Sequence, residues 1–285
     1  MYRRFSSLIK AQDLNSLIQK KSKIHILDST YAIPEKDGTP LSNHYKTRIT
    51  SSKFLDLLEI SDRSSPYPLM MPNNQQFISH MKKLGIKNDD TLVVCYDKLG
   101  VFSATRAWFV LKSFGKQNVK VLDGGLPYWL SQSYPTESGE YELYKDPSIE
   151  NDNDYRYSKD ASRVKAFEEA MAASKAADSV ILDARMTAIF NKEDPKLKIN
   201  HIKGAKNVPW KNLMNADATL KTQEELRNLY EGAGIRVDEE KAVISMCHQG
   251  LAACVNLFAL EELGKKASLY DGSWAEWKER YNENL

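Results

Sequence analysis

A cysteine occupies a short turn between a predicted strand and a predicted helix. The apolar run that precedes it, with Val243, Ile244 and Met246, predicts a buried strand. Apolar residues at helical spacing and a closing glycine predict a helix over residues 251–263. The first N–H groups of a helix lack internal partners and carry the positive end of the helix dipole, which favours a thiolate over a thiol. Cys247 is therefore placed as a nucleophile would be, with a buried structural cysteine as the alternative.

The composition is that of a folded chain long enough for two domains. Its 285 residues are 42% hydrophobic and 27% charged, with a formal net charge of +2 and no long basic run. We therefore expect no direct nucleic-acid binding and, without a long apolar stretch, no membrane span. The three cysteines form no Cys-x-x-Cys pair. This count argues against a disulfide framework or a structural zinc site and suggests a reducing compartment, and we expect no metal and no cofactor.

The chain is built from two copies of one sequence plan. Four blocks recur in the same order: residues 26–29 at 181–184, 48–49 at 201–202, 85–90 at 234–239, and 121–125 at 269–273. Such ordered repetition indicates a duplicated domain. Each copy alternates short apolar strands with helical segments, which predicts an α/β fold with a mainly parallel sheet flanked by helices.

Domain limits follow from the repeat. We expect a first domain at residues 1–140, a linker at 141–158 and a second domain at 159–285. The segment 131–159 is polar and contains two prolines, so it should run over the surface between the copies. In the second copy, helices are predicted over residues 162–175, 223–231 and 251–263.

The two copies differ at the position of the cysteine. In the first copy, Asp97 stands where the second copy has Cys247. A carboxylate can occupy a helix N-terminus but cannot perform thiol chemistry. We therefore expect a catalytically inactive first domain that forms one wall of the binding cleft.

With the repeat established, the chain resembles the tandem-domain rhodanese-like sulfurtransferases, which include thiosulfate and 3-mercaptopyruvate sulfurtransferases. The resemblance covers residues 8 to 277, nearly the whole chain. In the second copy it rests on segments 182–185, 201–205, 247–252 and 270–277, and in the first copy on segments 61–68 and 122–125. Each segment is a weak signal alone, but together and in order they are specific.

The resemblance implies two tandem rhodanese-like domains and a sulfurtransferase activity. Cys247 would take sulfane sulfur from 3-mercaptopyruvate or thiosulfate as a persulfide and pass it to a thiol, cyanide or a thioredoxin-like protein. An anion nest of turn amides would hold the persulfide, with Gly250 allowing the tight backbone. Substrate binding is expected from Arg185, His248, Gln249, Gly250, Leu251 and Ala252, and the protein is expected to be a monomer.

Donor preference is left open by three residues. Thiosulfate-selective relatives carry two cations after the cysteine, and mercaptopyruvate-selective relatives carry Gly-Ser, whereas this chain has His248 and Gln249. Ile189 stands where mercaptopyruvate enzymes place a second substrate arginine.

Several other residues of chemical interest are expected to be structural. Helical rise puts Cys254 about 10 Å from Cys247, beyond disulfide reach. We therefore predict core positions for Cys254 and Cys95, a turn role for His201, and packing roles for Trp129, Trp274 and Trp277.

Three other functions are considered. A cysteine phosphatase needs an arginine six residues after the nucleophile, where this chain has Ala253. A non-catalytic rhodanese-like binding module would usually lack the cysteine, which is present here. A sulfur carrier that serves a protein relay, for example in tRNA thiolation, is not distinguished from an enzyme acting on small thiols.

The N-terminus allows two interpretations. Residues 1–10 hold three basic residues, two serines and no acid, as a short mitochondrial presequence would. Alternatively Ser6 or Ser7 opens a first helix that buries Leu8, Leu14, Leu17 and Ile18, which is the interpretation we favour. Localisation is accordingly expected in the mitochondrion or the cytoplasm.

Overall fold

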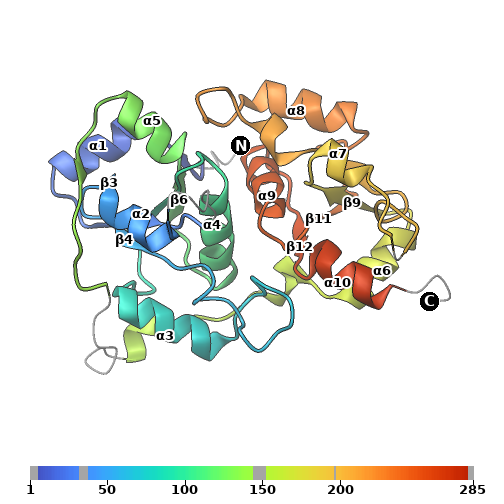
Figure 1. Ribbon diagram of the computed structural model, residues 1–285, viewed down its shortest axis with the longest axis horizontal. Helices are drawn as coiled ribbons and strands as arrows, with labels where there is room; N and C mark the ends of the chain where they lie inside the picture. Colours follow the sequence, from blue (N-terminus) through green and yellow to red (C-terminus); the bar gives the residue numbers. More distant parts are fainter. Residues whose placement is uncertain (1–5, 32–37, 144–151, 196, 282–285) are drawn as a thin grey trace.

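The computed structural model describes residues 6–31, 38–143, 152–195 and 197–281. Within these residues the chain forms two α/β domains that lie side by side, with α4 and α9 between them (Figure 1). Each domain has a five-stranded sheet in which every pair of neighbouring strands is parallel. The predicted fold class is confirmed.

The first domain contains the sheet β1-β6-β5-β2-β4. Its strands are β1 (Leu8–Ile9), β2 (Ile24–Asp28), β4 (Lys53–Phe54), β5 (Leu92–Tyr96) and β6 (Val119–Leu122). Its helices are α1 (Ala11–Gln19), α2 (Pro40–Lys46), α3 (Asn74–Leu84), α4 (Ser103–Ser113) and α5 (Gly125–Ser131). A small antiparallel ribbon joins β3 (Arg48–Ile49) to β7 (Thr136–Glu137).

The second domain contains the sheet β10-β9-β11-β12-β8. Its strands are β8 (Val164–Lys165), β9 (Ser179–Asp183), β10 (Lys206–Asn207), β11 (Ala242–Met246) and β12 (Ser268–Tyr270). Its helices are α6 (Phe167–Lys175), α7 (Thr187–Phe190), α8 (Gln223–Gly232), α9 (Ala253–Glu262) and α10 (Ser273–Arg280). Short 3₁₀ turns cover Asp152–Tyr155, Ala161–Arg163 and Trp210–Leu213. Read from β8, the strand order repeats that of the first domain read from β1, as the duplicated sequence predicts.

One continuous hydrophobic core joins the two domains. Residues of α4 and α9 contribute to the same buried cluster, and Trp108 meets Phe258 edge to face at 5.0 Å. Residues 253–260 of α9 are all buried, which explains why this stretch is apolar apart from Asn256. The outer face of each sheet is covered by a separate cluster of its own domain. The interface between the domains is therefore core rather than surface.

The structure corrects three local predictions. Leu8 lies in β1 and α1 begins at Ala11, so neither Ser6 nor Ser7 opens the first helix. The helix predicted over residues 162–175 begins only at Phe167, because the preceding residues form a 3₁₀ turn and β8. The linker is not wholly superficial, because Tyr155 and Tyr157 are buried in the shared core. Residues 1–5 of the proposed presequence lie outside the described residues.

The helices of the described residues are all too short or too polar to span a bilayer. The positions of Cys95 and Cys254 are as predicted, since both are buried and neither is disulfide-bonded. Trp129 and Trp277 are likewise buried against their own domains.

Acid should destabilise the protein partly through His25 on β2. Burial, helped by the charges of Lys53 and Lys116, lowers the pKa of His25 to about 4. In the unfolded chain this pKa is about 6.5. The neutral ring is thus favoured by folding, and its contribution to stability is lost as the pH falls from about 6.5 towards 4. We expect the Tm of the wild type to fall between pH 7.5 and pH 5, and His25→Gln to reduce that fall. An unchanged pH dependence in His25→Gln would contradict this assignment.

Candidate active site

Cys247 follows the central strand of the second sheet. It comes directly after β11, which pairs with β9 on one side and with β12 on the other. The carboxyl ends of these parallel strands bring Asp183, Met246 and Tyr270 to one edge of the sheet, where α/β proteins bind ligands. The Cys247 side chain is 3% exposed. The cysteine is therefore buried between the end of β11 and the start of α9.

The start of α10 anchors the backbone of Cys247. The Ser273 hydroxyl accepts the N–H of Cys247 at 3.2 Å and donates to the carbonyl of Tyr270 at 2.9 Å. The N–H of Trp274 donates to the Cys247 carbonyl at 3.1 Å, and the N–H of Ala275 to the His248 carbonyl at 3.0 Å. Early N–H groups of α10, which have no partner inside the helix, thereby fix the turn.

Ser273 adopts a backbone conformation that is unusual for its residue type. Its φ is +53°, in the left-handed region that side chains disfavour. The corresponding residue of the first domain is Gly125, which also has a positive φ of +52°. The second domain therefore tolerates strain in order to place a hydroxyl next to the cysteine, a pattern that clusters at functional sites.

The turn after Cys247 carries uncommitted hydrogen-bond donors. The backbone N–H groups of residues 248–253 donate to no acceptor among the described residues. Gly250 has φ +76°, and a Cβ built on it would lie 2.9 Å from the Asp271 carbonyl oxygen. Glycine is therefore required for the tight curvature of this turn. A run of unpaired N–H groups at the positive end of α9 is suited to an anion.

The first domain shows how such a turn holds a negative charge. There the Asp97 carboxylate accepts the backbone N–H groups of Leu99 at 2.7 Å, Phe102 at 2.9 Å and Ala104 at 2.8 Å. Burial raises the pKa of Asp97 although these three donors act in the opposite direction. The corresponding turn of the second domain presents a shorter side chain, Cys247, and leaves the N–H groups of Gln249 and Ala252 unused. The turn amides are thus bound by a side-chain carboxylate in the first domain but not in the second.

Arg185 lies at the carboxyl end of β9, where the sequence places it, but it is partly engaged. Its Nε approaches both carboxylate oxygens of Asp183 at 3.1 and 2.9 Å, and its Nη2 approaches Oδ2 at 2.6 Å. The guanidinium lies 4.5 Å from the centre of the Trp274 ring. Trp274 therefore packs against a charged group as well as against the core. Among the described residues, hydrogen bonds of the guanidinium are made by Nε and Nη2, and Nη1 has no partner.

His248 and Gln249 lie at the mouth of the turn, where His248 is exposed and Gln249 is partly buried. Desolvation, together with the positive charges of Lys278 and Arg185, lowers the pKa of His248. The imidazole is therefore mainly neutral at pH 7 and acts as a hydrogen-bonding group. The carboxylate of Asp183, which is paired with Arg185, acts on this pKa in the opposite direction. Ile189 on α7 is 51% exposed.

The remaining residues of interest have structural contacts. His201 stacks on Phe190 with a ring separation of 3.8 Å, as suits a turn residue. Cys254 donates its thiol to the carbonyl of Gly250 at 3.3 Å. Burial raises the pKa of Cys254 to about 12, so it stays a thiol. Among the described residues, no group of three or more His, Cys, Asp or Glu side chains could hold a metal ion.

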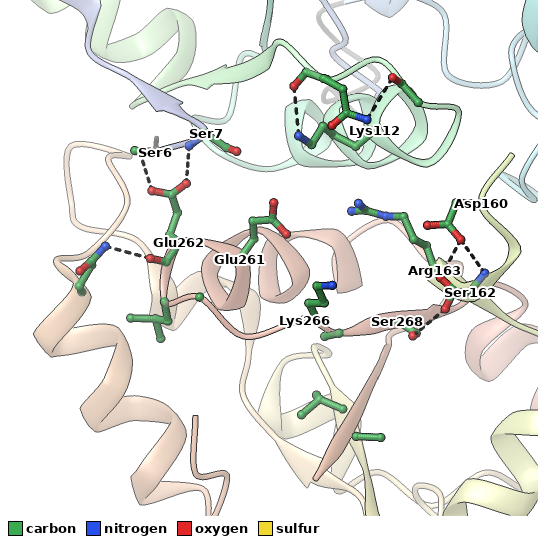
Figure 2. Close-up of a pocket in the computed structure, with 18 of the residues that line it drawn as sticks. Ser6, Ser7, Lys112, Asp160, Ser162, Arg163, Glu261, Glu262, Lys266 and Ser268 are labelled. Atoms are coloured by element: carbon green, nitrogen blue, oxygen red, sulfur yellow. Dashed lines mark hydrogen bonds between the residues drawn. The ribbon is translucent and has the colours of Figure 1, made fainter. Parts of the chain in front are cut away.

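A cleft of about 1020 Å³ lies elsewhere, between the domains (Figure 2). Its walls include Ser6 and Lys112 of the first domain and Glu261, Glu262 and Lys266 of the second. Cations and carboxylates alternate around it, so it has no single charge. It lies beyond the last turn of α9, whose ten residues span about 15 Å from the Cys247 turn. The cleft contains none of the predicted site residues.

Two residues near the turn were not singled out from the sequence. Ser273 carries no local signal apart from standing where the first copy has a glycine. Arg106 does carry one, because it is a lone cation in the apolar run of α4, and it proves to be 1% exposed.

Comparison with known proteins agrees with the fold. The family model described as "Rhodanese-like domain" matches residues 10–132 and 165–280. The 3-mercaptopyruvate sulfurtransferase of Escherichia coli (strain K12) is 35% identical over 264 residues, covering 90% of each chain. A thiosulfate/3-mercaptopyruvate sulfurtransferase of Arabidopsis thaliana, named as mitochondrial, is 30% identical over 286 residues, covering 90% of this chain and 72% of the relative.

The crystal structure of SseA from Escherichia coli, titled as a 3-mercaptopyruvate sulfotransferase with a rhodanese fold, superposes with a TM-score of 0.83 at 33% identity. The match covers 95% of this chain and 99% of that one. The relatives thus match both domains over almost their whole length. The chain therefore belongs to the rhodanese-like domain family, of which it carries two copies, and it is a tandem-domain sulfurtransferase.

Proposed function

We propose that Cys247 carries the transferred sulfur as a persulfide, and that the donor is 3-mercaptopyruvate or thiosulfate, the compounds named for the relatives. The observation that carries this proposal is the turn after Cys247, whose N–H groups at residues 248–253 are uncommitted. A persulfide is longer than a thiolate and places its negative outer sulfur within such a turn. The Asp97 carboxylate occupies the corresponding position in the first domain and supports this geometry.

The reaction consists of two half-reactions. The Cys247 thiolate attacks the outer sulfur of the donor and forms a new S–S bond. With 3-mercaptopyruvate, the C–S bond breaks and its electron pair remains on carbon, giving an enolate that takes up a proton to become pyruvate. With thiosulfate, the S–S bond breaks and sulfite leaves with the electron pair. An acceptor thiol, cyanide or a thioredoxin-like protein then attacks the outer sulfur and restores the thiolate.

Different residues around the turn would bind different parts of the donor. The amides of Gly250, Leu251 and Ala252 would hold the sulfur, and electrostatic stabilisation by such preorganised donors is worth about 3 kcal/mol each in related transition states. The Nη1 of Arg185 would bind the carboxylate or sulfonate of the donor. His248 and Gln249 at the mouth would hydrogen-bond the remainder of the donor.

We also propose domain limits of 1–140 and 159–285 with a linker at 141–158, which the family matches at 10–132 and 165–280 support. The first domain would be inactive because it has Asp97 in place of the nucleophile. We further propose a monomer located in the mitochondrion or the cytoplasm, and a relative named as mitochondrial supports the first of these locations.

Steady-state rates with each donor test the function. Purified protein is supplied with cyanide and with either 3-mercaptopyruvate or thiosulfate, and thiocyanate is measured over time. We expect turnover with at least one donor, and the ratio of the two kcat/KM values assigns the preference that His248, Gln249 and Ile189 leave open. No thiocyanate above the uncatalysed rate with either donor would contradict the proposal.

A further inference from the structure

Equivalent loops of the two domains form reciprocal hydrogen bonds across their interface. The N–H of Met71 in the first domain donates to Oδ2 of Asp271 in the second at 2.6 Å. In return, the N–H of Leu220 in the second domain donates to Oδ1 of Asp123 in the first at 2.8 Å. Two residues before each donor, Leu69 and Ala218 share a left-handed backbone, with φ of +62° and +69°. The interface is therefore nearly two-fold symmetric, as in an isologous dimer.

The symmetry is broken by one buried arginine. Arg106 on α4 crosses the interface, and its Nη2 donates to Oδ1 of Asp271 at 3.1 Å and to the carbonyl of Leu69. The corresponding residue on α9 is Asn256, which does not reach across. Asn256 instead donates to the carbonyl of Val208 at 3.0 Å and accepts the Tyr230 hydroxyl at 2.8 Å, both within its own domain.

Arg106 also reaches the turn that holds the cysteine. Its Nη1 donates to the carbonyl of Gly250 at 3.4 Å, and the same carbonyl accepts the thiol of Cys254. Burial acts to lower the pKa of Arg106, but Asp271 and Cys254 together, through charge and hydrogen bonding, act more strongly in the opposite direction, so the pKa is raised. A permanent charge is thus fixed behind the turn, on the side away from solvent.

We propose that Arg106 is a positioning residue through which the inactive first domain sets the geometry of the Cys247 turn for sulfur transfer. This inference rests on the proposed role of Cys247. A trans peptide is planar, so its N–H points opposite to its carbonyl. Holding the Gly250 carbonyl towards Arg106 directs the N–H of Leu251 away from the interface. The retention of a domain without a nucleophile then has a mechanistic reason, because the turn depends on a side chain that only the other domain supplies.

Arg106→Gln removes the positive charge and the guanidinium donors. Arg106→Lys keeps the charge, but a single ammonium group cannot reproduce the guanidinium's contacts with Gly250, Leu69 and Asp271. The matched control is Arg163→Gln. The Arg163 guanidinium packs against α4, the helix that carries Arg106. It lies 5.7 Å from the Trp108 ring centre and 5.2 Å from that of Phe109, and among the described residues it makes no hydrogen bond with the Cys247 turn. Each variant is mixed with excess 3-mercaptopyruvate in the absence of acceptor, and the rate constant of persulfide formation on Cys247 is measured by quenched mass spectrometry. Circular dichroism melts report the stability of each variant.

We expect Arg106→Gln to form the persulfide about ten-fold more slowly, as loss of one hydrogen bond to a charged donor predicts. Arg106→Lys should be intermediate, and Arg163→Gln should match the wild type even if its melting temperature falls. If Arg106→Gln does not fold, the comparison rests on Arg106→Lys and Asp271→Asn, which weaken the same contact.

The outcomes separate the two proposals. A wild type that forms no persulfide overturns the role of Cys247. If the folded Arg106 variants form the persulfide as fast as the wild type, the role of Cys247 stands and the role of Arg106 is overturned. Equal slowing in Arg163→Gln would likewise overturn it, because any weakening of the interface would then suffice.

Discussion

Cys247→Ser is expected to reduce sulfur transfer at least about 1,000-fold, because the covalent nucleophile is removed. Serine is close in size and keeps the backbone N–H that donates to Ser273. Its hydroxyl cannot form a persulfide, whatever the turn does to stabilise an anion. Thiocyanate production with the better donor, at equal concentrations of folded protein, measures the effect.

Cys95→Ala is the control for this substitution. Cys95 is fully buried on β5 of the first domain, and burial raises the pKa of its thiol well above the usual range. It should remain protonated and unreactive, so Cys95→Ala should turn over like the wild type. Activity that survives Cys247→Ser but falls in Cys95→Ala would place the chemistry in the first domain and contradict the role of Cys247.

Arg185→Gln is expected to lower kcat/KM for the anionic donor about 100-fold, since hydrogen bonds to charged groups contribute about 1.5–3 kcal/mol. The uncommitted Nη1 is the group that would bind the donor anion, while Nε and Nη2 are held by Asp183. Arg185→Lys retains a charge without the fork and should recover only part of the loss.

A neutral reagent separates binding of the anion from damage to the turn. Iodoacetamide needs no cation, so Arg185→Gln should alkylate Cys247 at close to the wild-type rate while reacting poorly with the donor. The double variant Asp183→Asn, Arg185→Gln controls for the buried carboxylate that loses its partner. Equal losses towards iodoacetamide and towards the donor would show that Arg185 supports the turn rather than the substrate.

The two-domain α/β architecture could be predicted from the sequence because the same ordered sequence blocks occur in both halves of the chain. Strands such as 242–246 are apolar and end at residues of chemical interest, and the helix predicted over 223–231 corresponds closely to α8 (Gln223–Gly232). The helix predicted over residues 251–263 begins at Ala253, two residues later than predicted, because residues 251 and 252 belong to the turn that follows the cysteine. Residues 162–166 carry no strong period, and pairing of β8 with β12 overrides their helical tendency.

The contacts that complete the site were not accessible in this way. Arg106 is 141 residues before Cys247 in the chain and acts through the fold. Only the packing of α4 against α9 brings its guanidinium to Gly250. The strain at Ser273 and the engagement of Arg185 by Asp183 depend on backbone angles and rotamers that residue spacing does not specify. Local patterns thus predict where strands end, and the tertiary structure decides what meets there.

The mass of the peptide that contains Cys247 is the most direct test of the central claim. Wild-type protein is incubated with donor, digested without reductant and compared with an untreated sample. We expect a gain of about 32 Da, one sulfur atom, on Cys247 alone, and its loss after addition of cyanide or a thiol. An unmodified Cys247 in protein that is turning over donor, or a stable adduct on Cys95 or Cys254 instead, would contradict it.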